Sequence, residues 1–159
     1  MATYSINNIA PGTLTNMSTS QKSSLSVTSS TALLRRGWIY EFEIGAFDVP
    51  NATDCPINWQ LVRQSTLGTG VAASSSTAPF DAADAASQLV YTANYTIEPT
   101  PGASLFYMGL NQRASQRMIY KDIASSPCIP AVNVNGMSMT AKSPNYASTW
   151  STTFNVLEG

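Results

Sequence analysis

Residues 36–45 read Arg-Gly-Trp-Ile-Tyr-Glu-Phe-Glu-Ile-Gly, and their pattern is strongly periodic. Every second position from 38 to 44 is apolar, and Glu41 and Glu43 fall between these positions. The apolar positions are Trp38, Tyr40, Phe42 and Ile44. A period of two residues places alternate side chains on opposite faces of a β-strand. The stretch therefore predicts a long central strand with one buried face.

Comparable patterns recur along the chain, separated by loops that contain Pro, Gly, Asn and Asp. We expect further strands at residues 57–64, 90–97, 104–110, 117–122, 136–140 and 147–157. The tally is about eight strands, and the crossover helices that parallel strands require are missing. The sequence therefore predicts an all-β protein, a jelly-roll-like antiparallel β-sandwich.

One short helix is expected at residues 81–86, which read Asp-Ala-Ala-Asp-Ala-Ala. Alanine has the highest helix propensity, and the Asp81 side chain is suited to capping the first turn. A helix this short is not stable by itself, so we expect it to dock on a sheet.

Residues 1–31 differ in composition from residues 32–159, which we expect to form the sandwich domain. They are rich in Ser, Thr and Asn, and Lys22 is their one charged residue. The segment fits either a polar N-terminal arm or a pair of short edge strands at residues 12–17 and 24–28. We favour an extended arm that leads into a first strand.

The composition excludes several classes of function. The 159 residues suit one domain, and only 11% of them are charged, less than half the usual quarter. The net charge of −1 argues against binding to nucleic acid or to an anionic membrane. No run approaches the roughly 18 apolar residues of a membrane span, and residues 1–16 lack the features of a secretory signal. We expect synthesis in a cytoplasm.

The sequence offers few candidates for catalytic residues or metal ligands, because it has no histidine. Glu41 and Glu43 would be paired acids of an enzyme, but a solvated or inter-subunit face opposite an arginine is the favoured interpretation. Calcium binding by Asp48 and Asp54 is a weaker hypothesis than turn-forming roles. We expect no enzyme activity, cofactor or metal.

The two cysteines, Cys55 and Cys128, are separated by too long a stretch for the sequence to decide whether they pair. Free buried thiols are favoured in a reducing compartment, and a disulfide formed after release from the cell stays open.

Three tryptophans raise the possibility of carbohydrate binding on exposed aromatic rings. Trp38, Trp59 and Trp150 each fall on the apolar side of an expected strand, so we favour a place in the core.

Five basic residues are candidates for an interface: Lys22, Arg35, Arg36, Arg113 and Arg117. In a nearly neutral chain, we expect the arginines to pair with carboxylates within or between subunits rather than with nucleic acid.

Several segments resemble small structural proteins of tailed bacteriophages. The resemblance is carried by residues 35–45 and by Leu-Asn-Gln-Arg-Ala at 110–114, and residues 59–64, 81–86 and 94–96 are similar. It implies a capsid decoration (cement) protein, which binds the major capsid protein on the virion surface as a homo-oligomer, often a trimer. Residues 2–30 would then drape over the shell. The alternative is a phage tail or receptor-binding module that recognises carbohydrate.

Overall fold

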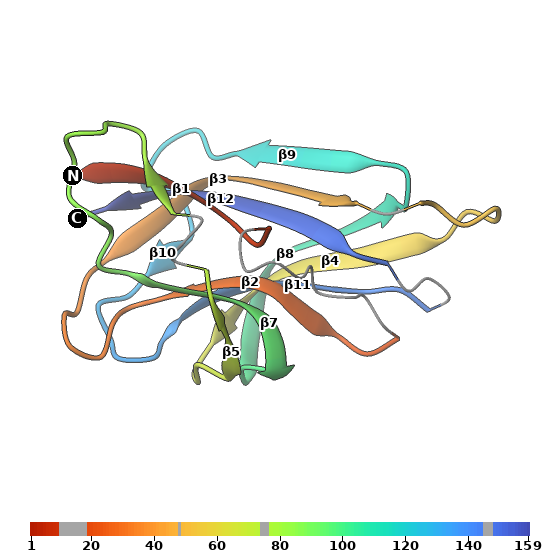
Figure 1. Ribbon diagram of the computed structural model, residues 1–159, viewed down its shortest axis with the longest axis horizontal. Coiled ribbons are helices and arrows are strands. Elements are labelled where there is room, and N and C mark those ends of the chain that lie inside the picture. Colours follow the sequence, from red (N-terminus) through yellow and green to blue (C-terminus); the bar gives the residue numbers. More distant parts are fainter. Residues whose placement is uncertain (10–18, 48, 74–76, 145–147) are drawn as a thin grey trace.

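The computed structural model describes residues 1–9, 19–47, 49–73, 77–144 and 148–159. In this part of the chain, twelve strands form two sheets that pack face to face (Figure 1). The described residues contain no helix, and hence none long and apolar enough to cross a membrane. The prediction of an all-β antiparallel sandwich is confirmed.

Sheet I is the upper layer in Figure 1, and all its pairs are antiparallel. Its strands are β1 (Ala2–Asn7), β3 (Gly37–Ala46), β6 (Ala78–Pro79), β9 (Ser115–Ile119), β10 (Cys128–Ile129) and β12 (Trp150–Glu158). Their order is β10-β3-β12-β1-β6, and β9 also pairs with β3.

Sheet II is the lower layer, and its pairs are antiparallel as well. Its strands are β2 (Lys22–Thr28), β4 (Pro56–Gln64), β5 (Thr69–Ala72), β7 (Val90–Ile97), β8 (Pro101–Asn111) and β11 (Gly136–Lys142). Their order is β5-β7-β2-β11-β4-β8, so β5 and β8 border the sheet.

The core lies between the two sheets and is lined by apolar side chains from nearly every long strand. Trp59 of sheet II and Trp150 of sheet I are fully buried, with ring centroids 5.5 Å apart. Phe42 of β3 contacts Phe106 of β8 edge to face at 5.1 Å. Aromatic pairs of this kind add stabilisation beyond the burial of their area.

A β-bulge interrupts β3, so the alternation expected for this strand is wrong at its first residues. Asn155 of β12 pairs with Glu41 and Val156 pairs with Ile39, so Tyr40 has no partner on β12. The extra residue in a bulge reverses which side chains face inward beyond it. Ile39, rather than Trp38 or Tyr40, is therefore buried in the core at this end of β3, whereas Phe42 is buried as expected.

The interpretation of residues 1–31 as an extended arm is wrong for the two stretches that form strands. β1 lies between β12 and β6, and β2 lies between β7 and β11. The expected strand at 24–28 is thus part of β2, but in the interior of a sheet and not at its edge. The other expected edge strand, at 12–17, lies outside the described residues.

The expected helix at residues 81–86 is also wrong, because the chain forms only a turn there. Asp81 does cap this turn, since its Oδ1 accepts a hydrogen bond from the Ala83 N–H at 2.9 Å. Most side chains of the segment are exposed, so no apolar face packs on a sheet. Without such packing, so short a helix is unstable.

Candidate interaction surface

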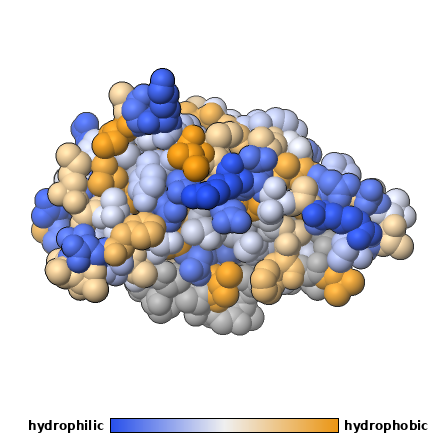
Figure 2. All heavy atoms as spheres, turned by 90° about the horizontal axis from the view of Figure 1, so that it is seen from above, coloured by the Kyte–Doolittle hydropathy of each residue, from blue (hydrophilic) through white to orange (hydrophobic). Residues whose placement is uncertain are grey.

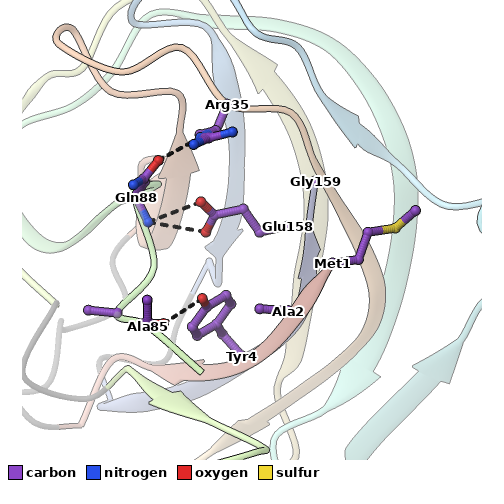
Figure 3. A pocket seen from close by; sticks show the side chains of 9 residues that line it. Met1, Ala2, Tyr4, Arg35, Ala85, Gln88, Glu158 and Gly159 are labelled. Carbon is purple, nitrogen blue, oxygen red and sulfur yellow. Dashed lines mark hydrogen bonds between the residues drawn. The ribbon is translucent and has the colours of Figure 1, made fainter. Parts of the chain in front are cut away.

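The five basic residues expected at an interface are not gathered into one patch. Arg35 lies at the end of the sandwich that holds both chain ends, and Arg113 lies in the β8–β9 turn at the opposite end (Figures 1 and 3). Arg113 forms an ion pair with Asp54, with 3.2 Å between Nε and Oδ1. The Lys22 ammonium lies 3.5 Å from Glu98. Arg113 therefore pairs with a carboxylate within the chain, as expected for the arginines, whereas Arg35 and Arg36 form no ion pair in the described part of the chain.

A cavity of about 250 Å³ lies beside the chain ends, where Figure 3 shows Arg35 above Glu158 and Tyr4. Arg35 Nε donates to Gln88 Oε1 at 2.5 Å, and the Gln88 N–H donates to both carboxylate oxygens of Glu158 at 3.1 Å. Tyr4 donates to the Ala85 carbonyl at 2.7 Å. These contacts fasten residues 85–88 to sheet I, so the polar groups of the cavity have a structural role.

The two glutamates of β3 have different surroundings. Glu41 is largely buried and forms an ion pair with Arg117 of β9, as expected for one of the arginines, whereas Glu43 is exposed. Hydrogen bonding from Arg117 holds the pKa of Glu41 below its ordinary value of 4.5, although partial burial acts in the opposite direction. A carboxylate held ionised by an arginine is a poor general acid.

Stability is expected to fall as the pH drops below the ordinary Glu41 pKa of 4.5. Because folding lowers this pKa, the contribution is fully present above the unfolded value and is lost as pH falls through the folded value. The measurement is the urea midpoint at about pH 7 and about pH 3. Arg117→Gln should narrow the difference between the two midpoints.

Arg63→Gln is the matched control for this pH experiment. The Arg63 guanidinium donates to the Cys128 carbonyl at 3.4 Å and contacts no carboxylate in the described part of the chain. Its loss should leave the pH dependence unchanged. An identical pH dependence in Arg117→Gln and the unaltered protein would contradict the assignment to Glu41.

Metal ligation finds no support among the described residues, where no group of three or more His, Cys, Asp or Glu side chains is suitably placed. Asp54 is paired with Arg113, and Asp48 lies outside the described residues. Cys55 and Cys128 are free thiols, one buried and one half-buried.

A loop with two exposed apolar side chains projects from the end of the sandwich opposite the chain ends (Figure 1). It joins β3 to β4, and we call residues 47–55 the tip loop. The Phe47 side chain is 64% exposed and the Val49 side chain is 83% exposed. Binding residues are concentrated on loops, so two exposed apolar side chains close together in one loop make it a candidate for recognition.

The base of the tip loop is fastened by the turn that follows β8. Gln112 is buried, and its amide nitrogen donates to the carbonyls of Asn51 and Thr53, both at 3.0 Å. Its amide oxygen accepts from the Asn51 N–H at 3.3 Å. Arg113 adds a bond of 3.0 Å to the Asn51 carbonyl beside its ion pair with Asp54. The second part of the tip loop is therefore fastened to the β8–β9 turn.

Sequence reasoning did not single out this loop, and the available signal was the presence of Phe47 and Val49 within a loop of Pro, Asn and Asp. It also did not single out the exposed Tyr107 of β8, which lies in an uncharged run at residues 101–111.

The tryptophans divide between the core and the surface. Trp59 and Trp150 are buried, so the expectation is confirmed for them. Trp38 is half-buried on the outer face of sheet I. Its expected position in the core is wrong, because the bulge in β3 turns its side chain outward. Figure 2 views the molecule from this side and shows a mosaic of hydrophilic and hydrophobic residues.

No family model, curated protein or solved structure matches the chain.

Proposed function

We propose that this protein is a virion structural protein, a capsid decoration protein that binds the major capsid protein on the head surface as an oligomer. The observation that carries this proposal is the tip loop, which exposes the Phe47 and Val49 side chains and is hydrogen-bonded to the β8–β9 turn. In protein–protein interfaces, a few anchor residues carry most of the binding energy. A loop that is already ordered before contact loses less conformational freedom when it binds.

The support of the tip loop links the geometry to the phage resemblance. Residues 110–114 are among the segments that carry the resemblance, and Gln112 and Arg113 within them hold the loop. A decoration protein needs its docking loop to be ordered, and residues 110–114 would serve this purpose. The resemblance itself implies the shell as the partner.

The sandwich is, in this proposal, a jelly roll, an architecture that viral capsid domains use. A jelly roll is one long hairpin folded over, so that its first strand pairs with its last and each inner pair is nested within. The pairs that support this order are β1 with β12, β2 with β11, β3 with β9 and β4 with β8. Residues 69–97, with β5 to β7, are then an insertion between the fourth and fifth strands. Fold alone does not imply function, so this order supports the tip-loop argument without replacing it.

Shell binding is tested with capsids assembled from the major capsid protein without their decoration protein. The purified chain should cosediment with them. Phe47→Ser should weaken binding by about 2 kcal/mol, roughly thirtyfold, because truncating an anchor of an interface has this effect. Light scattering on the decorated shells would confirm the added mass.

Phe80→Ser is the matched control for the tip loop. Phe80 is similarly exposed, at 59%, but lies between β6 and β7. Its replacement should leave shell binding unchanged. Equal losses in both variants, or no cosedimentation of the unaltered chain, would contradict the proposal.

A carbohydrate-binding tail module is the second candidate, and the half-buried Trp38 favours it. Trp38 and Tyr40 lie on the outer face of sheet I, where a sugar ring would stack. Glycan binding that is lost in Trp38→Ala and kept in Phe47→Ser would establish this candidate instead.

A further inference from the structure

The long edge strand β8 differs from every other border of the two sheets in the described part of the chain. It contains eleven residues, pairs there only with β4, and carries no charged side chain. Its one proline is the first residue, Pro101. The outer edge of such a strand offers unpaired backbone N–H and C=O groups to another strand.

The other border strands are protected in the ways that natural sheets use. β5 has four residues, and β6 and β10 have two residues each. β9 has five residues and presents Arg117. The border of sheet II at β8 is thus open to pairing, whereas the short borders are not.

The register between β8 and β4 shifts twice, between Phe106 and Ser104 and between Ser104 and Pro101, and these shifts define the part of the strand that is suited to pairing. Phe106 pairs with Leu61 and Ser104 pairs with Val62, so Leu105 is bulged. From Phe106 to Asn111 the register with β4 is regular. Along this stretch the half-buried inward side chains alternate with exposed outward ones.

We propose that β8 pairs antiparallel with the β8 of a second copy of this chain, around a twofold axis at Met108. This register places Phe106 opposite Leu110 of the second copy on the inner face. On the outer face it places Tyr107 opposite Gly109. The pairing joins both copies of sheet II into one continuous sheet, and each contact occurs twice, as a twofold interface requires.

The side chains of the regular stretch are complementary to themselves in this register. Tyr107 is 62% exposed, and its hydroxyl donates to Asn58 Oδ1 of β4 at 3.2 Å, a bond that the ring gives up when it turns toward the second copy. An aromatic ring laid over a glycine of the neighbouring strand is a stabilising cross-strand pair. A Cβ at Gly109 would meet only the Asn58 side chain, at 3.8 Å, so there is open space for the ring. The absence of charge along residues 101–111 means that the two copies bring no like charges together.

Exposed apolar area on this side of the sandwich supplies part of what a stable dimer needs. Phe106, Met108 and Leu110 of β8 are half-buried, and Met118 of β9 and Tyr120 line the same open side next to the core. An aromatic residue buries about 150–250 Å² when fully covered, so the residual exposure of these side chains and of Tyr107 amounts to several hundred Å². A standard interface needs about 800 Å² per partner, to which the paired backbone also contributes.

The mass of the free protein, measured by sedimentation over a range of concentrations, tests this pairing. We expect a dimer for the unaltered chain. Tyr107→Lys should raise the dissociation constant by about tenfold or more, because two like charges then approach each other near the axis. Val71→Lys is the matched control, since Val71 is an exposed apolar residue on β5 at the other border of sheet II. It should dimerise like the unaltered chain.

A cross-link tests the register itself. Residues directly opposite in an antiparallel pair have Cα atoms about 4.5–5.5 Å apart, within the range that a disulfide spans. Met108→Cys should therefore form a disulfide-linked dimer on mild oxidation. Val71→Cys and the unaltered chain, with Cys55 and Cys128, should not.

Three results would overturn the proposal: a monomer at all concentrations, a trimer such as the phage resemblance implies, or a dimer that Tyr107→Lys leaves intact. The measurements use free protein, so they are read separately from shell binding. A dimer that does not bind shells would contradict the proposed function alone, and a shell-binding trimer would contradict the pairing alone.

Discussion

A chain that lacks residues 1–30 is expected to lose cooperative folding. The deletion removes β1 from the interior of sheet I and β2 from the interior of sheet II, so β12 and β11 each lose a paired neighbour. It also removes four buried core side chains, which are Tyr4, Ile6, Leu25 and Val27. At about 1.5–3 kcal/mol for each buried side chain, the loss is comparable to the whole stability of a domain, about 5–15 kcal/mol.

The measurement for this deletion is denaturant unfolding followed by circular dichroism, together with binding of a dye that reports exposed apolar surface. Ile9→Ser in the full-length chain is the control, because Ile9 lies in the same segment but is exposed and outside the sheets. It should unfold cooperatively near the midpoint of the unaltered protein. A cooperative transition of unchanged slope in the deleted chain would mean that residues 1–30 are an arm after all.

Gly136→Ala is expected to destabilise the fold by about 3 kcal/mol, the upper end of what overpacking costs. A Cβ at Gly136 would lie 2.0 Å from the Val27 carbonyl oxygen and 2.8 Å from the Thr28 Cα. Both atoms belong to the backbone of β2, so no rotation of a side chain relieves the clash. The first residues of β11 would have to separate from β2, where Gly136 pairs with Thr28.

Gly109→Ala is the matched control for Gly136→Ala. It places the same methyl group in another strand of sheet II, where the nearest atom is 3.8 Å away. Its free energy of unfolding in urea should fall by less than about 1 kcal/mol, as for most surface substitutions. Equal shifts in the two variants would show that loss of glycine, and not contact with β2, sets the effect. Dilute protein keeps any dimer contact at β8 out of the comparison.

Much of the fold was accessible from local pattern. The strand expected at 90–97 coincides with β7, and those expected at 57–64 and 136–140 fall within β4 and β11. Alternation of apolar and polar residues is a property of a strand and the sheet face it covers, so it is visible without knowledge of the partners. In β1, Tyr4 and Ile6 alternate with polar residues in the same way, but the pattern is short and the segment around it is polar, so no strand was expected there.

The candidate site was accessible only in part. Of the four arginines expected to pair with carboxylates, two do so in the described part of the chain, Arg113 with Asp54 and Arg117 with Glu41. The tip loop and the β8 edge were not recognised, because exposure is decided by what the rest of the chain covers. Phe47 in a loop and Phe42 in a strand are the same residue type, and only their surroundings separate an anchor from a core side chain.

By itself, the sequence determined that this protein is an all-β sandwich with few charges, because strand periodicity and composition are written in neighbouring residues. The tertiary structure alone decided which strands are interior and which are borders. It placed β1 and β2 inside the sheets, left β8 at an open edge, and turned Trp38 outward through the bulge beside Tyr40. These features depend on strand pairing between residues far apart in the chain, such as Asn155 with Glu41, and no local pattern specifies such a register.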